Sequence, residues 1–178
     1  LRTGMLKKAL RKNIVKYFAV LPESDVNSEQ REVLKYLENN EVRIFPYPFH
    51  EKYSPDKIEV IYDRANGMRY VMQAGKRLYF KKRWSEKRIK IAFSDLMREQ
   101  DINSPHRYLN DSFTIGKDDV LADIGAGEGN FSLAVIEKVR KIYIFEYNKD
   151  WIQALRATFA PWPEKVEIIN KYVSDVND

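Results

Sequence analysis

The stretch that decides the fold is Asp123-Ile124-Gly125-Ala126-Gly127-Glu128-Gly129. A short apolar run at residues 120–124 leads into it, and a helical run at 131–138 follows it. A strand that passes through a glycine turn into a helix is the opening unit of a parallel α/β sheet. Further along, we expect a strand at 141–146, a helix at 150–159 and a strand at 166–169. The sequence therefore predicts β-α-β-α-β, a parallel sheet with helical crossovers.

The spacing of the glycines bears on which ligand the turn would bind. A dinucleotide fingerprint, G-x-G-x-x-G from Gly125, would place its third glycine at position 130, but that residue is Asn130 and the glycine is Gly129. S-adenosylmethionine carries no phosphate, so its turn need not bring a helix N-terminus to an anion. It needs a backbone without side chains beside the amino acid and ribose, and it benefits from a carboxylate such as Asp123 near the ammonium. The spacing favours S-adenosylmethionine over a dinucleotide.

An acid after the second strand supports the same interpretation. Glu146 follows Gly125 by about 20 residues, where nucleotide-binding folds place an acid that accepts hydrogen bonds from ribose hydroxyls. One carboxylate can accept two such bonds. The third strand should end near the adenine, and Ser174 and Asp175 lie just beyond it. Two other readings are a generic strand-to-helix turn and a nicotinamide enzyme with shifted glycines.

At these residues the chain resembles the FkbM-type family of S-adenosylmethionine-dependent methyltransferases. The resemblance covers residues 104–176, through Ser104-Pro105-His106-Arg107-Tyr108-Leu109, Asp123 to Ser132, Phe145-Glu146 and Lys171-Tyr172-Val173-Ser174-Asp175. It implies S-adenosylmethionine as cofactor and O-methylation of a hydroxyl on a sugar or natural product. The candidate cofactor-binding residues are Asp123, Gly125, Ala126, Gly127, Gly129, Asn130, Glu146, Tyr147, Ser174 and Asp175. Glu128, inside the glycine turn, departs from the family's usual pattern.

No catalytic residue is assigned by the sequence. His106 could serve as a general base for a hydroxyl nucleophile, although a capping or packing role is favoured. We expect Glu99 and Asp101 to be solvated charges at a helix end. The aromatic residues Trp151, Phe159 and Trp162 are expected to pack the second helix of this segment on the sheet.

Residues 1–103 have a different sequence pattern from the residues that follow, which predicts two domains. We expect an α+β domain at 1–103 and a partial Rossmann-like methyltransferase domain at 104–178. The expected elements of the first are an amphipathic helix at 5–20, a helix at 28–39 with Ser28 as N-cap, a strand at 42–45, an antiparallel meander of strands at 58–63, 68–73 and 77–81, and a helix at 86–99 capped by Ser85. Val33, Leu34 and Leu37 should face inward.

Composition excludes several classes of protein. The chain of 178 residues has no cysteine and two histidines, which excludes disulfides, thiolate metal sites and a histidine-rich centre. The absence of cysteine fits a metal-free cytoplasmic protein, and no apolar run approaches the about 18 residues of a membrane span. The favoured explanation of the net charge of +5 is basic side chains on solvent-exposed surfaces. Nucleic-acid binding at Lys81-Lys82-Arg83-Trp84, membrane-surface contact of the first helix, and homo-oligomers are the alternatives.

Only the first half of a methyltransferase domain is expected in this chain. Complete domains that the resemblance implies have further strands, which usually help to hold the acceptor, a small molecule or saccharide. The chain then carries cofactor-binding elements without the groups that orient an acceptor. A fragment of a longer protein is the favoured explanation. An RNA methyltransferase and a non-catalytic interaction module on a truncated methyltransferase scaffold are the other hypotheses.

Overall fold

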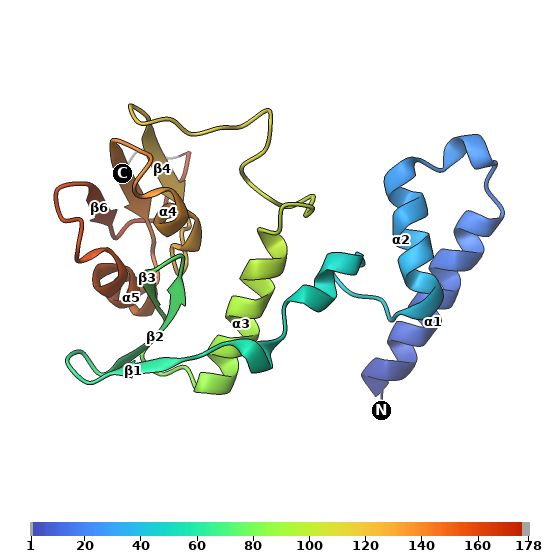
Figure 1. The fold of residues 1–178 in the computed structure, drawn as a ribbon, viewed down its shortest axis with the longest axis horizontal. Coiled ribbons are helices and arrows are strands. Elements are labelled where there is room, and N and C mark those ends of the chain that lie inside the picture. The colour runs from blue at the N-terminus through green and yellow to red at the C-terminus, as the bar shows by residue number, and fades with distance from the viewer. Residues whose placement is uncertain (1, 176–178) are drawn as a thin grey trace.

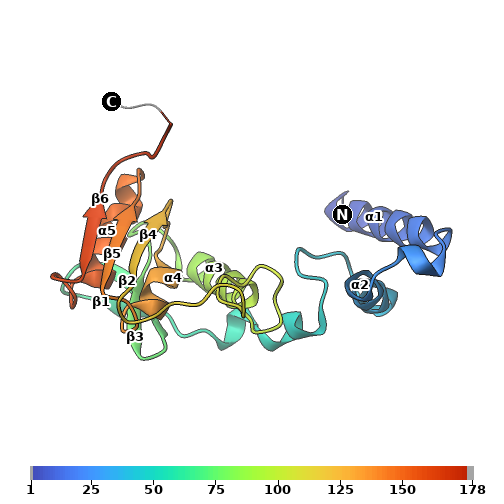
Figure 2. The ribbon, with the colours of Figure 1, turned by 90° about the horizontal axis from the view of Figure 1, so that it is seen from above.

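The computed structural model describes residues 2–175, with side chains from residue 4 onward. Its helices and strands alternate as the sequence indicates, with two sheets at one end of the molecule and a helical hairpin at the other (Figures 1 and 2). The elements are α1 (Arg2–Ala19), α2 (Ser28–Asn39), β1 (Ile61–Asp63), β2 (Met68–Gln73), β3 (Lys76–Tyr79), α3 (Glu86–Glu99), β4 (Val120–Ile124), α4 (Asn130–Val135), β5 (Lys141–Phe145), α5 (Lys149–Phe159) and β6 (Val166–Ile169), with 3-10 turns at Glu23–Asp25, Pro48–Lys52 and Pro55–Lys57.

The C-terminal part has the predicted β-α-β-α-β order. Its three strands are parallel and lie in the order β4-β5-β6. The register pairs Ile124 with Phe145 and Phe145 with Ile169, so the three strands end at one level. Since the carboxyl ends of parallel strands share one edge of the sheet, the glycine turn after β4 comes to lie beside the residues that follow β5. The predicted α/β fold class, with an antiparallel meander before the β-α-β-α-β unit, is confirmed.

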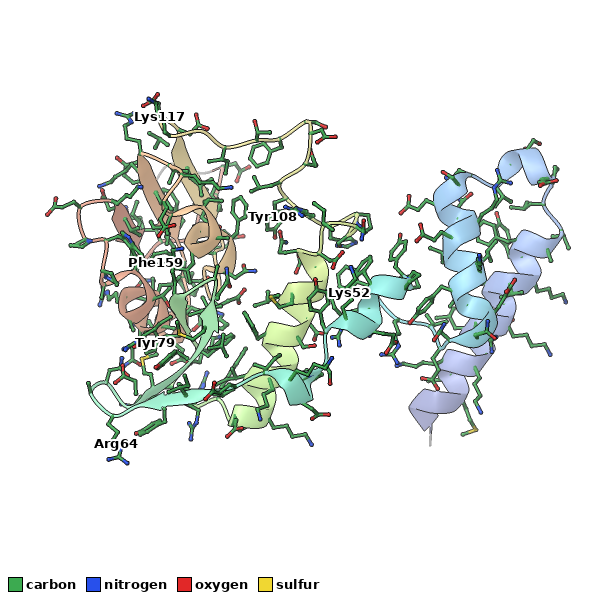
Figure 3. All side chains as sticks on the ribbon, viewed as in Figure 1. Lys52, Arg64, Tyr79, Tyr108, Lys117 and Phe159 are labelled. Atoms are coloured by element: carbon green, nitrogen blue, oxygen red, sulfur yellow. The ribbon has the colours of Figure 1, made fainter. Side chains whose placement is uncertain are left out.

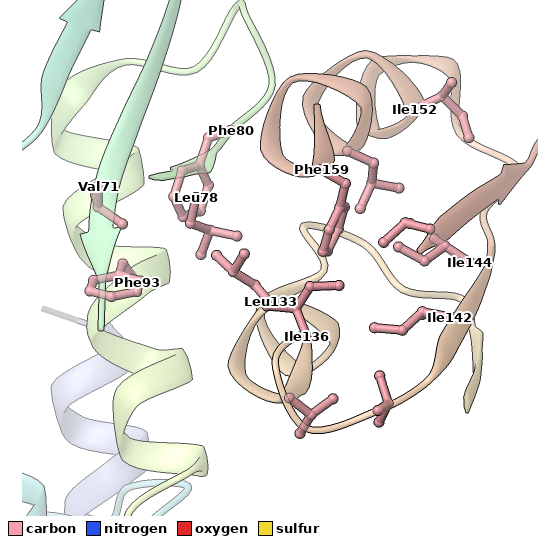
Figure 4. Close-up of a cluster of buried hydrophobic side chains, with 14 of the residues drawn as sticks. Val71, Leu78, Phe80, Phe93, Leu133, Ile136, Ile142, Ile144, Ile152 and Phe159 are labelled. Carbon is pink, nitrogen blue, oxygen red and sulfur yellow. The ribbon is translucent and has the colours of Figure 1, made fainter. Parts of the chain in front are cut away.

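The core joins this sheet to the earlier segment. On β5, Ile142 and Ile144 are fully buried and face α4 and α5, as alternation along a strand requires. Their cluster includes Leu133, Phe159 and, from the meander, Leu78 (Figure 4). The predicted packing role of the aromatic residues of α5 and the following turn is confirmed, because they belong to or pack against this cluster.

The meander covers the helices and does not extend the parallel sheet. Its middle and last strands contact α4 and α5: the backbone N–H of Tyr79 donates to Thr158 Oγ1 at 3.0 Å, and Gln73 Nε2 donates to the carbonyl of Asn130 at 2.7 Å. Within the parallel sheet, β4 is an edge strand: among the described strands it pairs with β5 alone, and its Val120 and Ile124 side chains are exposed. One hydrophobic core therefore crosses the sequence boundary expected near residue 103.

Two local predictions in the first part of the chain are wrong. Residues 42–45 form no strand; Phe45 instead packs with Tyr47 and Phe49 in a small separate cluster. Prolines 46 and 48 lack the N–H groups that a ladder would need. The N-cap of α2 is Asn27 and not Ser28. Asn27 accepts from the backbone of Gln30 at 2.8 Å, and the Gln30 side chain accepts in return at 2.9 Å, because a capping box needs Gln or Glu three residues after the cap.

The hairpin of α1 and α2 uses only part of its apolar surface. Ile14 and Phe18 are half-buried against α2, while Leu6 and Leu10 are exposed. On α2, Leu37 is buried as predicted, while Val33 and Leu34 are only half-buried. Among the described residues, no helix has the length and apolarity needed to cross a membrane.

Candidate functional site

The glycine turn is held in a conformation that ordinary residues rarely adopt. Gly127 and Gly129 have φ of 57° and 76°, in the left-handed region that favours glycine. A Cβ on Gly129 would also lie 2.7 Å from Leu155 Cδ2, so this position has no room for a side chain. Gly129 thus lets α4 begin tightly against α5. Its role in the fold is packing, and the open face of the turn is formed by the residues before it.

The side chain of Glu146 holds the glycine turn in place. Its side chain is buried, its Oε2 accepts from the backbone N–H of Gly127 at 2.9 Å, and its Oε1 accepts from the N–H of Asn148 at 2.7 Å. Asn148 in turn caps α5. One carboxylate therefore connects the end of β5, the glycine turn and the start of α5. Each carboxylate oxygen has a second lone pair with which it can accept a further hydrogen bond.

A cavity of about 500 Å³ opens on the front of the turn. The turn and the end of β4 form one wall, the end of α3 forms another, and the segment around Tyr108 forms a third (Figure 3). Tyr108 packs edge-on against Phe131, with ring centroids 5.0 Å apart. The lining residues are Leu96, Glu99, Gln100, Tyr108, Phe113, Leu121, Ala122, Asp123, Ile124, Gly125, Ala126, Gly127, Glu128, Asn130 and Phe131. The volume lies within the range of small-molecule sites.

The charged side chains that line this cavity are all acidic. Burial raises the pKa of Glu128 to about 7, against a backbone hydrogen bond that lowers it, and the nearby carboxylates of Glu99, Asp123 and Glu146 raise it further. Burial also raises the pKa of Asp123, although the Ser132 hydroxyl donates to its Oδ2 at 2.5 Å and lowers it. Clustered carboxylates whose pKa values are raised would be relieved by a bound positive charge. The cavity is suited to a cationic ligand.

The structure brings together half of the candidate residues. Asp123, Gly125, Ala126, Gly127 and Asn130 line the cavity.

The remaining candidates lie around or outside the cavity. Glu146 supports the turn, as described above, and Tyr147 beside it is 72% exposed. Ser174 and Asp175 are in the exposed segment after β6. His106 does not line this cavity, and its ring packs edge-on against Phe45, with ring centroids 5.1 Å apart. The structure thus places His106 in a packing contact away from the glycine turn.

The end of α3 forms part of the site, which the sequence pattern does not predict. Glu99 lines the cavity, and Asp101 is buried, so the expectation of a solvated charge is wrong for Asp101. Asp101 Oδ2 accepts from the Tyr53 hydroxyl at 2.5 Å and from Lys52 Nζ at 3.3 Å. Burial alone would raise the pKa of Asp101, but these bonds and the N–H of Asn103 bring it below its ordinary value. Lys52 and Tyr53 lie far from Asp101 in the sequence, so the local pattern gives no sign of these two contacts.

A cluster of cations and aromatic rings lies on the other side of the glycine turn. Trp84 and Trp151 meet edge to face at 5.1 Å, Lys81 Nζ lies 4.5 Å from the Trp151 ring, and the guanidinium of Arg88 lies 4.2 Å from the Trp84 ring. The indole Nε1 of Trp151 would be 4.0 Å from a Cβ on Gly127. Of the three cations in the predicted basic run at 81–84, Lys81 thus packs on aromatic faces. Within residues 2–175, no group of histidine and acidic side chains could hold a metal ion.

Comparisons with known proteins give partial likenesses. No protein-family model and no curated protein matches the chain. Among solved structures, a "putative RNA methyltransferase" from Pyrococcus horikoshii is 25% identical over 35% of this chain and 32% of its own, with a TM-score of 0.32. A precorrin 8w decarboxylase from Methanobacterium thermoautotrophicum is 26% identical over 31% of each chain, with a TM-score of 0.29. A "putative transferase" from Pyrococcus horikoshii is 14% identical over 91% of this chain and 63% of its own, with a TM-score of 0.41. The chain spans about a third of the first two and under two thirds of the third.

Proposed function

We propose that the cavity at the glycine turn binds S-adenosylmethionine and that the protein takes part in O-methylation of a hydroxyl group on a small acceptor. One observation carries the proposal: the turn after β4 leaves a side-chain-free backbone beside a cavity lined by acids. The cofactor has a sulfonium and an ammonium group and no phosphate, which fits an acidic site with this glycine spacing. The proposal agrees with the resemblance to the FkbM-type family.

Each side chain has a distinct part in this proposal. Asp123 and Glu128 provide the negative charge that faces the ammonium and sulfonium groups. Gly125 and Gly127 leave room for the methionine and ribose portions. Glu146 holds the turn through the Gly127 N–H and keeps lone pairs for a ribose hydroxyl. Tyr147, Ser174 and Asp175 would lie on the adenine side.

The chemistry is a displacement that depends mostly on positioning. When bound, S-adenosylmethionine supplies an electrophilic methyl group: the acceptor oxygen bonds to it, the C–S electron pair returns to sulfur, and the hydroxyl proton leaves to a base or water. The residues of this chain contribute by orienting the two ligands and excluding water. We assign no general base among the lining residues.

Calorimetry with S-adenosylmethionine on the whole chain tests the proposal. We expect Asp123→Asn to weaken binding by about tenfold or more, because a charge-assisted contact is lost while the geometry is kept. Asp118→Asn, an exposed acid outside the cavity, is the matched control and should leave the affinity unchanged. Absence of binding by the wild-type chain would overturn the proposal and favour the non-catalytic interaction module.

RNA methylation is the second candidate, and the cluster of Lys81, Arg88, Trp84 and Trp151 favours it. Cations and aromatic faces beside a cofactor site are what single-stranded RNA uses for phosphate and base contacts. If RNA is the acceptor, binding of a short single-stranded RNA should weaken steeply with salt, and Lys81→Ala should reduce the salt dependence. Absence of binding at low salt contradicts this candidate.

A further inference from the structure

A second cavity of about 330 Å³ adjoins the cofactor cavity. Leu96, Gln100, Asn130 and Phe131 line both, so the two spaces share a wall. Beyond that wall, the second cavity lies between α3, α4 and the turn that joins β2 to β3. Its apolar surface includes Phe93 from the middle of α3. This arrangement places an apolar space directly beside the proposed methyl donor.

Gln100 gives this wall an unused hydrogen-bond donor. Its Oε1 accepts from the backbone N–H of Tyr108 at 3.4 Å, which orients the amide. Its Nε2 is buried and has no hydrogen-bond partner among the described residues. Buried donors in native proteins are normally paired. A ligand oxygen in the cavity would satisfy this one.

Arg107 gives the same cavity a positive charge. Its side chain is half-buried and makes no ion pair with an acid in the described part of the chain. No Asp or Glu is found among the residues that line this cavity, whereas the first cavity is lined by Glu99, Asp123 and Glu128 and by no Lys or Arg. The two adjoining spaces therefore have opposite electrostatic preferences.

We infer that the second cavity binds a small apolar molecule that carries an anionic oxygen, such as an aromatic carboxylate. Its apolar body would contact Phe93, Leu109 and Phe131, and its oxygens would accept hydrogen bonds from Gln100 Nε2 and the Arg107 guanidinium. Binding at this cavity stands by itself, and only the further role of this ligand as the methyl acceptor, or an analogue of it, rests on the proposed function.

The test uses 2-naphthoate as probe, with the neutral 2-naphthamide and the cationic 2-naphthylmethylamine as matched ligands. We expect the whole chain to bind the anion most tightly and the cation least in ligand-observed NMR titrations. Arg107→Gln should weaken naphthoate binding about tenfold and abolish the preference for the anion. Arg64→Gln, an exposed position between β1 and β2 that does not line the cavity, should change nothing. Ala134→Leu, at an exposed helical position on the cavity wall, should block all three ligands.

Two outcomes overturn the inference: no binding of naphthoate, or binding that neither Arg107→Gln nor Ala134→Leu weakens. Calorimetry with S-adenosylmethionine on the same variants separates this failure from that of the proposed function. Cofactor binding without naphthoate binding rejects the second cavity alone. Naphthoate binding that both variants weaken, without cofactor binding, rejects the methyltransferase and leaves an anion-selective site.

Discussion

The parallel sheet and the α1–α2 hairpin bury their apolar residues to different extents. In the sheet region, Ile142, Ile144 and Leu133 are entirely buried, and one cluster joins them to the meander. In the hairpin, Leu6 and Leu10 are exposed even though they fit a helical stripe. The same kind of pattern thus has two outcomes, because burial depends on what lies opposite the stripe. The difference indicates that stability is concentrated around the sheet.

The largest expected effect comes from truncating one leucine in each region. Leu133→Ala removes a fully buried side chain and should lower the free energy of unfolding by about 3 to 5 kcal/mol. Leu10→Ala, at a half-exposed position of α1, should cost less than about 1 kcal/mol, since Ala favours a helix and little contact is lost. Urea denaturation measures both. Equal losses would show that the hairpin is as tightly packed as the sheet.

A pair of glycines sharpens the comparison inside the sheet region. Gly129 and Gly75 have φ of 76° and 78°, so an alanine suffers the same backbone strain at both. Only Gly129 is closely packed, with Leu155 2.7 Å from a Cβ position, while Gly75 faces open space. Gly75→Ala should cost about 1 kcal/mol and Gly129→Ala about 2 to 4 kcal/mol. Thermal unfolding reports the difference, and equal shifts would contradict the close packing at the turn.

The sequence also predicts the sheet region better than the first part of the chain. Between Val120 and Ile169 the sequence predicts each strand to within one residue, because the strands and the turn are set by local alternation and glycine conformation, whereas the predicted helix at 131–138 runs three residues beyond α4. The error at residues 42–45 arose where aromatic residues pack across irregular backbone. In the site, the glycine turn was predictable. Glu99 and Gln100 were not, because they reach the cavity only through the long-range packing of α3.

The acids of the cavity predict a pH dependence of stability. The pKa of Glu128 is raised from 4.5 to about 7 in the folded chain, so between these values the folded state holds more protons than the unfolded state. The free energy of unfolding should therefore fall as pH rises from about 4.5 to 7. Glu128→Gln removes this contribution and should be more stable than the wild type by about 1 to 3 kcal/mol at pH 8, with little difference at pH 4.

Ligand binding provides the control for this prediction. Binding of a cationic ligand that favours the ionised form of Glu128 should release protons near pH 6.5. Calorimetry in two buffers of different ionisation enthalpy detects this release. Glu128→Gln should release fewer protons, while Glu38→Gln on the exposed face of α2 should match the wild type in both measurements. A stability profile that is unchanged by Glu128→Gln would place this carboxylate in water, outside the acidic cluster.

The smallest expected effect belongs to the hairpin and is a stabilisation. Gly4 lies in the first turns of α1 with no atom within 4 Å of a Cβ position, and it has no positive φ that would favour glycine. Gly4→Ala should stabilise α1 by about 0.5 to 1 kcal/mol, because alanine loses less backbone entropy in a helix. The gain should appear in hydrogen exchange of α1 amides and leave the unfolding midpoint of the sheet unchanged. If the midpoint rises by the same amount, the hairpin and the sheet unfold as one cooperative unit, and the contrast between them is one of packing and not of independence.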